Sequence, residues 1–138
     1  MSAFSLRQAH VDQALPSRSY QVNEVQLFLY NAAIWNAHRI HYDLPYTREV
    51  EQHQALLVDG PLQGDWLMQL VYAVMDDGDT LESFNYQNRH SAYVGEPLVA
   101  SGKVEQIDGN RVHLSLSISN AQGKLSTVGK AVVCSNIS

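Results

Sequence analysis

The residues best suited to chemistry lie together in the nine-residue stretch Trp35–Asp43. It holds two of the six histidines, an asparagine amide, an arginine and an aspartate. An imidazole exchanges protons near neutral pH, and an amide or carboxylate beside it can orient water or hold the ring. The same residue types also satisfy backbone groups of polar loops, but their density here favours a functional site.

A second candidate is the segment Asp59-Gly60-Pro61-Leu62, which predicts the start of a helix. Asp59 is a residue type that caps helices, and Pro61 suits the first helical position. The free N–H groups at such a start, reinforced by the helix dipole, can hold a carbonyl oxygen that becomes negative during a reaction. Capping and carbonyl binding are compatible at one helix start.

Hydrophobic periodicity indicates how these two segments are positioned. Apolar residues at helical spacing predict a helix over 24–34, with Asn23 and Gln26 as a capping pair. The predicted loop 35–43 follows, and Pro45 opens a short helix over 45–51. The stripe of the first helix consists of Val25, Phe28, Leu29, Ala32 and Ala33.

The longest helix is predicted to begin at Pro61 and to end at Asp76-Asp77-Gly78, with apolar residues over much of its girth, which indicates burial. After it the apolar period changes from 3.6 to 2. Four antiparallel strands in a meander are predicted near 81–91, 96–107, 111–120 and 125–134. Residues 1–19 form an entry segment with one edge strand at most. The expected class is α+β, with a sheet that wraps a helix.

The composition fits one globular domain over residues 1–138, with 45% apolar and 17% charged residues. A net charge of −5 and the lack of a basic run argue against nucleic acid as a partner. No apolar stretch reaches the 18 or more residues of a transmembrane helix, so no membrane contact is expected. The single Cys134 and the absence of a leader pattern make the cytoplasm the expected location.

The motif WNAHRIHYD (Trp35–Asp43), followed by LVDGPL (Leu57–Leu62), resembles the MaoC-like hydratase and dehydratase family. The resemblance is closest to the branch of 3-hydroxyacyl thioester dehydratases and mesaconyl-CoA hydratases. VDQALP (Val11–Pro16) and YVGEPLVASGKV (Tyr93–Val104) match the family's entry segment and strand rhythm, so the likeness covers most of the chain. It implies the hot dog fold, a long central helix wrapped by an antiparallel sheet, in agreement with the elements predicted above.

The resemblance implies reversible addition of water to a 2-enoyl thioester of coenzyme A or acyl carrier protein, with no cofactor and with His41 as acid/base. Asn36 stands where many relatives have an aspartate, and an amide can orient water but cannot exchange a proton. Asn36 is therefore expected to position water, and the change Asn36→Asp to keep or raise activity. Asp43 is expected to orient the imidazole or the local loop.

By the same resemblance, the thioester carbonyl is polarised where the central helix begins. Pro61 has no N–H, so Gly60 and Leu62 are the available donors. Relatives often have histidine in place of Asp59, whose charge near an enolate is unfavourable unless the side chain turns back to cap the helix. They also tend to have arginine and then proline in place of Gln87 and Ser91. The coenzyme phosphates are then expected to contact other cations, such as Arg39, Arg48 or Arg89, with His38 also near the substrate.

Two other functions stay open. Hot dog thioesterases use a carboxylate on or near the central helix, for which Asp59 or Asp65 is available. The chain is alternatively a non-catalytic subunit that pairs with an active partner. A metal site from His38, His41 and Asp43 lacks a clear fourth ligand and is not expected. A dimer is expected, either of identical chains or with a related hot dog subunit, with the final strand around Val132 at the junction.

Overall fold

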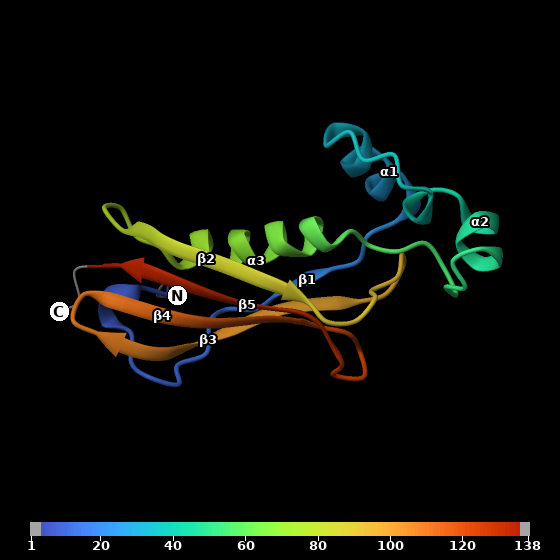
Figure 1. Ribbon diagram of the computed structural model, residues 1–138. Helices are drawn as coiled ribbons and strands as arrows, with labels where there is room; N and C mark the ends of the chain where they lie inside the picture. Colours follow the sequence, from blue (N-terminus) through green and yellow to red (C-terminus); the bar gives the residue numbers. More distant parts are fainter. Residues whose placement is uncertain (1–3, 136–138) are drawn as a thin grey trace.

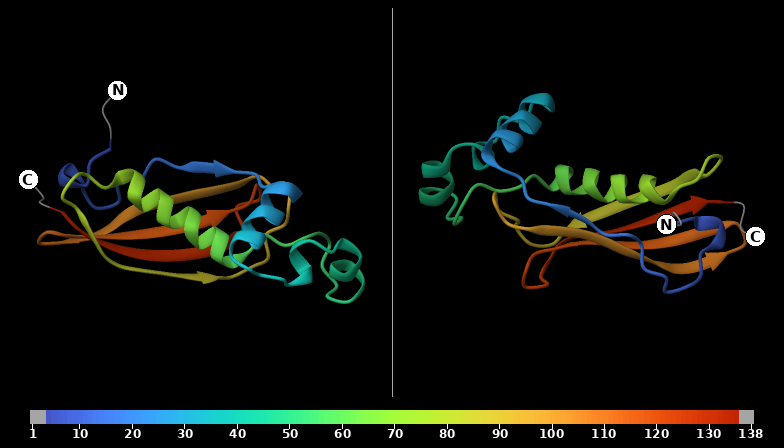
Figure 2. Two further views of the ribbon diagram at one scale, coloured as in Figure 1. Left: turned by 90° about the horizontal axis from the view of Figure 1, so that it is seen from above. Right: turned by 180° about the vertical axis from the view of Figure 1, so that it is seen from behind.

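The computed structural model describes residues 4–135. Its main feature is a long helix, α3 (Gly60–Val74), that lies along one face of an antiparallel sheet (Figure 1). Seen from above in Figure 2, this helix runs obliquely across the strands. The α+β class and the wrapping of a helix by a sheet are therefore as predicted.

Within the described residues the sheet has five strands in the order β1-β3-β4-β5-β2. They are β1 (Arg18–Tyr20), β2 (Thr80–Asn88), β3 (Leu98–Asp108), β4 (Arg111–Ser119) and β5 (Leu125–Cys134). The edge strand allowed for in the entry segment is present as β1. All neighbouring strands are antiparallel, and the turns Asp108-Gly109 and Gln122-Gly123 join β3 to β4 and β4 to β5 as predicted.

The expected four-strand meander is wrong for β2, which pairs with β5 and not with β3. Alternating apolar residues show that a strand has a buried face but do not name its neighbour. Residues 89–97 lead from β2 at one edge to β3 beside β1, whereas a tight turn would have placed the two strands side by side. As a result β5 is an inner strand, and β2 forms the long edge of the sheet.

The core lies between α3 and the sheet. Leu67, Leu70 and Val71 of α3 are fully buried, and the alternating residues of β4 point at them. The ring of Tyr20 on β1 stacks on Trp66 of α3 with centroids 4.4 Å apart. The inward residues of β4 are Val112, Leu114, Leu116 and Ile118. This packing fixes the start of α3 relative to the sheet.

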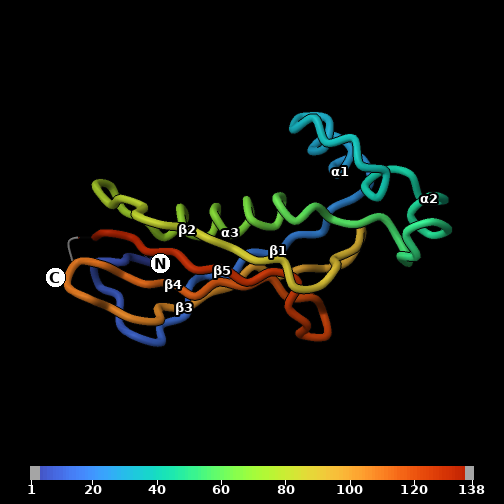
Figure 3. The backbone as a smooth tube through the Cα atoms, viewed as in Figure 1, coloured from blue at the N-terminus to red at the C-terminus, as the bar shows by residue number. Residues whose placement is uncertain are grey.

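Two shorter helices, α1 (Glu24–Ala33) and α2 (Leu44–Glu49), project beyond one end of the sheet (Figure 3). The predicted capping box is present, since Asn23 accepts from the Gln26 N–H and the Gln26 side chain accepts from the Asn23 N–H. The loop predicted between the helices contains one turn of 3-10 helix, Arg39–His41.

The apolar stripe of α1 faces outward, contrary to the usual orientation of such a stripe. Val25, Phe28 and Leu29 are 66%, 58% and 60% exposed, whereas Leu27 and Asn31 are buried. The helix contacts the rest of the chain through a narrow face because it overhangs the end of the sheet. No helix among the described residues has the length and apolarity to cross a membrane.

Candidate active site

His41 occupies the last position of the 3-10 turn and is only 7% exposed. Its Nδ1 lies 2.8 Å from the carbonyl oxygen of Leu57. A carbonyl oxygen only accepts, so Nδ1 carries the proton and donates it to this bond. The other ring nitrogen, Nε2, lies 3.3 Å from Oδ2 of Asp59. The ring is thus held at one nitrogen by backbone and faces a carboxylate with the other.

Asp59 stands at the N-cap of α3, but its side chain makes no capping hydrogen bond. Its Oδ1 accepts from Nδ2 of Asn31 at 2.8 Å, and its Oδ2 accepts from Nδ2 of Asn36 at 3.2 Å. The expectation that the side chain turns back to cap the helix is therefore wrong. Pro61, the second residue of α3, removes one of the two N–H groups from which a capping side chain accepts, and the Asp59 carboxylate accepts from the two asparagine amides instead.

Asn36 reaches Asp59 because the chain reverses at the end of α1. Trp35 has φ +58°, in the left-handed region that a tryptophan rarely adopts, and the next N–H donates to the Asn31 carbonyl at 3.0 Å. The side-chain oxygen of Asn36, Oδ1, accepts from the His38 N–H at 3.1 Å, which orients the amide. Asn36, His41 and Asp59 therefore converge from three different segments.

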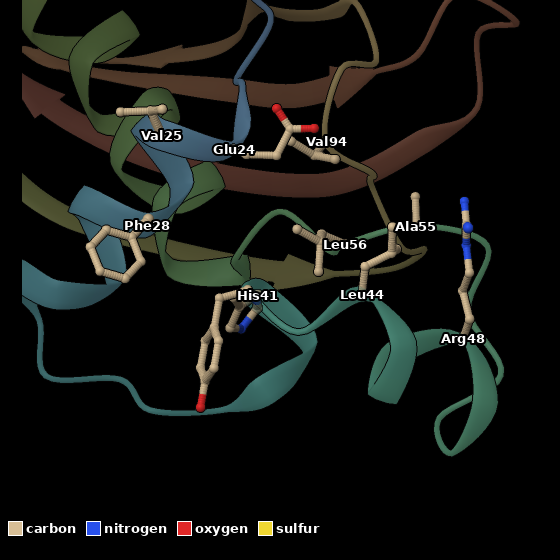
Figure 4. A pocket seen from close by; sticks show the side chains of 10 residues that line it. Glu24, Val25, Phe28, His41, Leu44, Arg48, Ala55, Leu56 and Val94 are labelled. Carbon is tan, nitrogen blue, oxygen red and sulfur yellow. The ribbon is translucent and has the colours of Figure 1, made fainter.

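Two hollows meet at His41. The larger, about 550 Å³, is lined mainly by apolar side chains of α1, α2 and the segment before α3, which includes Ala55 and Leu56 (Figure 4). In that view Phe28 and Leu56 lie beside the imidazole, and Arg48 lies toward the far end. The smaller hollow, about 360 Å³, is more polar and includes Gly60 and Arg89. A molecule spanning both hollows would pass the imidazole.

Gly60 is the first residue of α3, so its N–H has no acceptor within the helix. A Cβ at this position would lie 2.2 Å from Oδ1 of Asn88, which requires glycine or a displaced asparagine. Asn88 is itself held, because its Nδ2 donates to Oγ1 of Thr127 at 3.0 Å. Gly60 and Asn88 both line the smaller hollow, so the start of α3 borders it.

Asp43 does not contact the imidazole, so that part of its predicted role is wrong. It accepts from the Tyr46 N–H at 3.2 Å as the cap of α2 and forms an ion pair with Arg39 at 2.8 Å. The Arg39 hydrogen bond, followed by that of the Tyr46 N–H, holds the pKa of Asp43 below its ordinary value. Its contacts belong to the loop, and its position keeps it out of a metal site with the two histidines.

The remaining predicted site residues lie in different surroundings. Arg89 lines the hollow that contains Gly60, whereas Arg39 packs over the Tyr46 ring at 4.0 Å and is committed to Asp43. His38 accepts from the Ile40 N–H, with its ring 6.1 Å from that of His41. The Leu62 side chain lines a separate hollow beside Trp66 and not the two that meet at His41.

Sequence reasoning missed Asn31 and treated Asp59 mainly as a cap. Asn31 is buried and donates to both Asp59 and the Leu27 carbonyl. A detectable signal was an amide four residues after Leu27, on the one buried face of α1. Burial, with the nearby charges of Asp65 and Asp59, raises the pKa of the neighbouring Tyr30 well above its ordinary value.

Comparison with known proteins identifies the family. The family model of hydroxyacyl-thioester dehydratase type 2 matches residues 5–94, well over half of the chain and including every residue of this cluster. The chain belongs to the hydroxyacyl-thioester dehydratase type 2 family. The family match ends before β3, so the remaining strands are related to known proteins by fold.

This dehydratase-family chain is also similar to individual proteins. It is 50% identical over 44 residues to mesaconyl-C(4)-CoA hydratase of Chloroflexus aurantiacus, a match that covers 32% of this chain and 16% of that enzyme. The R-hydratase of Pseudomonas aeruginosa superposes with a TM-score of 0.80 at 19% identity, covering 94% of this chain and 83% of that one.

The ChsH1–ChsH2 complex of Mycobacterium tuberculosis gives a TM-score of 0.81 at 12% identity, over 91% of this chain and 98% of that one. At these identities the solved structures show the shared fold alone. That fold is the hot dog fold expected from the sequence, and the structures that share it include MaoC-like dehydratases.

Proposed function

We propose that the protein catalyses the reversible addition of water to 2-enoyl thioesters, which yields 3-hydroxyacyl thioesters. The observation that supports this most directly is the position of His41, at the junction of an apolar hollow and a polar one that contains the helix start at Gly60. The acyl chain would occupy the apolar hollow, and the thioester carbonyl would lie beside the Gly60 N–H.

In the hydration direction, the oxygen of water bonds to C3 of the substrate while a proton passes from water to Nε2 of His41. The electron pair of the double bond moves onto the thioester oxygen, whose negative charge the Gly60 N–H and the helix dipole stabilise. The imidazole then returns a proton to C2. Asn36 is proposed to hold the water through its second Nδ2 hydrogen, since the first donates to Asp59, and the Leu57 carbonyl keeps the ring in place.

The carrier of the thioester is proposed to be coenzyme A or acyl carrier protein. Arg89 lines the polar hollow, at the side where a phosphate-bearing arm would leave the site. Arg48 lines the apolar hollow instead, and the ion pair of Arg39 with Asp43 removes that guanidinium from the candidates. Of the three arginines considered from the sequence, Arg89 is therefore the proposed phosphate contact.

We also propose that two copies pair through the β2 edge, and that a related hot dog subunit is the alternative partner. In the described part of the chain β2 is paired on one side only, with β5. An unpaired strand edge and the exposed apolar face of α1 are both surfaces that a partner chain would cover. The final strand is internal, so the junction predicted at Val132 moves to β2.

We also propose a cytoplasmic location for the protein, because Cys134 is a free thiol.

The decisive experiment incubates the purified chain with crotonyl-CoA and, separately, with butyryl-CoA. Loss of enoyl absorbance with formation of 3-hydroxybutyryl-CoA is the expected result. Release of free coenzyme A from butyryl-CoA without hydration would establish a thioesterase. Inactivity toward both, with hydration only after a second hot dog chain is added, would establish a non-catalytic subunit.

A further inference from the structure

The carboxylate of Asp59 is completely shielded from solvent, although it stands at the N-terminus of a helix. Removing a carboxylate from water costs several kcal/mol unless hydrogen bonds and charges compensate. Here it has three polar neighbours, the amides of Asn31 and Asn36 and the ring of His41, and the helix cap is not among them. Helix capping therefore does not explain why the Asp59 carboxylate is buried.

The two oxygens of this carboxylate differ in their surroundings. Oδ1 faces Asn31, which in turn donates to the Leu27 carbonyl inside α1, so this side is fixed to the scaffold. Oδ2 faces Asn36 and Nε2 of His41 at 3.2 Å and 3.3 Å, and His41 lines both hollows. One oxygen anchors the group, and the other meets the nitrogen proposed to exchange protons.

The other hydrogen bonds of His41 and Asp59 determine how many protons lie between the two side chains. Nδ1 of His41 holds a proton because its partner is the Leu57 carbonyl, and both contacts of Asp59 with the asparagines use their N–H groups. Nε2 and Oδ2 at 3.3 Å therefore form a hydrogen bond when one proton lies between them. With no proton there, two lone pairs would face each other in a buried space.

We propose that Asp59 is a positioning residue that shares this one proton with His41, so that the acid/base unit is the His41–Asp59 pair and not His41 alone. The inference rests on the proposed function. During hydration the shared proton moves onto Oδ2 of Asp59 while Nε2 accepts one proton from water, whose oxygen bonds to C3. Nε2 then gives one proton to C2, and the shared proton returns to its place between Nε2 and Oδ2. The pair ends the cycle with the proton count at which it began.

The structure also changes the expected effect of Asn36→Asp. The Asn36 amide donates to Asp59, so a second carboxylate at position 36 would face the first across about 3.2 Å. Two carboxylates so close cannot both be ionised without a large penalty. We therefore expect Asn36→Asp alone to lower activity, in contrast to the expectation from the sequence. The exchange variant Asn36→Asp/Asp59→Asn still places one amide beside one carboxylate.

The test compares Asp59→Asn, the exchange variant Asn36→Asp/Asp59→Asn, and Asp108→Asn as a control. Asp108 is exposed at the end of β3 and borders neither hollow. Hydration of crotonyl-N-acetylcysteamine, which carries no phosphates, is followed from pH 5 to 9 together with thermal unfolding. Titratable or charged groups around the pair are His38, Tyr30, Asp65, Arg89 and His90.

For the wild type we expect a bell-shaped profile of kcat/KM, because both loss of the shared proton and addition of a second one stop the cycle. Asp59→Asn should lower kcat about 10²-fold, lose one limb of the profile and leave KM within about twofold. The exchange variant should recover at least about tenfold of the lost rate, and Asp108→Asn should match the wild type.

The proposal is overturned if Asp59→Asn keeps more than half of the wild-type kcat. It is also overturned if the pH profile of the residual activity of Asp59→Asn keeps both limbs. If both variants fail to fold, the wild type still decides, because a profile with a single limb between pH 5 and 9 contradicts a shared proton. A wild type that does not hydrate either enoyl thioester contradicts the proposed function itself, which separates the two failures.

Discussion

The Leu57 carbonyl accepts a hydrogen bond from Nδ1 of His41 at 2.8 Å, and the Leu57 N–H donates to the Ile40 carbonyl at 3.0 Å. One residue therefore holds both the ring and the backbone of the 3-10 turn. Leu57 also forms a bridge with Tyr93 and lies two residues before Asp59, so it connects the histidine to the start of α3.

Replacement of His41 by alanine should reduce kcat for hydration by a factor on the order of 10² to 10⁴, because it removes the group proposed to exchange protons. Steady-state kinetics with crotonyl-CoA measure the effect, with circular dichroism to verify the fold. His10→Ala is the matched control, since His10 is exposed and lies in the entry segment. A His41→Ala protein with more than half of the wild-type activity would refute the assignment.

Gly60→Ala should lower kcat about 10²-fold, the loss that a displacement of about 1 Å at a reacting group can cause. The added methyl group would lie 2.2 Å from Oδ1 of Asn88 and on the side of the thioester carbonyl. Gly60→Ala/Asn88→Gly removes the clash inside the protein. Full recovery in the double variant would mean that the carbonyl does not bind at Gly60.

Arg89→Ala should raise KM for crotonyl-CoA about tenfold, which corresponds to one lost charged hydrogen bond. It should leave kinetics with crotonyl-N-acetylcysteamine unchanged, because that substrate has no phosphate. Arg111→Ala serves as the control, since Arg111 pairs with Glu82 on the sheet. An equal loss with both substrates would show that Arg89 acts on the site itself and not on the coenzyme.

Asn85→Glu should weaken self-association of the protein. Asn85 is exposed in the single chain and lies in the middle of β2, so the change costs the monomer little. Pairing of two β2 edges around a two-fold axis brings the new charges near each other, which is unfavourable. Sedimentation velocity measures the shift, with Gln122→Glu in the β4–β5 turn as the control. Unchanged association of Asn85→Glu would exclude β2 as the junction.

Asp43→Asn should lower the thermal stability at pH 7, and the difference from the wild type should shrink below about pH 4. Asparagine keeps the helix cap but not the ion pair with Arg39. The folded-state pKa of Asp43 is lowered, so its contribution is present above the unfolded value of about 3.9 and is lost as pH falls through the folded value. Arg39→Gln should remove the larger part of the same pH dependence, because the Tyr46 N–H still donates to Asp43. A constant difference in Tm from pH 3 to 7 would contradict this.

The sequence alone predicted the main elements because their causes are local. Asn23 and Gln26 form the predicted capping box, and the glycine turns at 109 and 123 join β3, β4 and β5. Apolar residues at period 3.6 gave α3, and period 2 gave the strands. The cluster Trp35–Asp43 and the helix start at Gly60 were likewise evident, because residue type and spacing are properties of the chain itself.

Tertiary structure alone decided which of these residues meet. It paired β2 with β5 and made β5 an inner strand, which moved the proposed junction away from Val132. It also brought Asp59 and Asn31 to the imidazole side of the cluster. A capping preference depends only on the first turn of a helix, whereas the orientation of a buried carboxylate depends on which donors the rest of the fold supplies. Those donors come from segments 23 and 28 residues earlier, a distance at which spacing carries no information about contact.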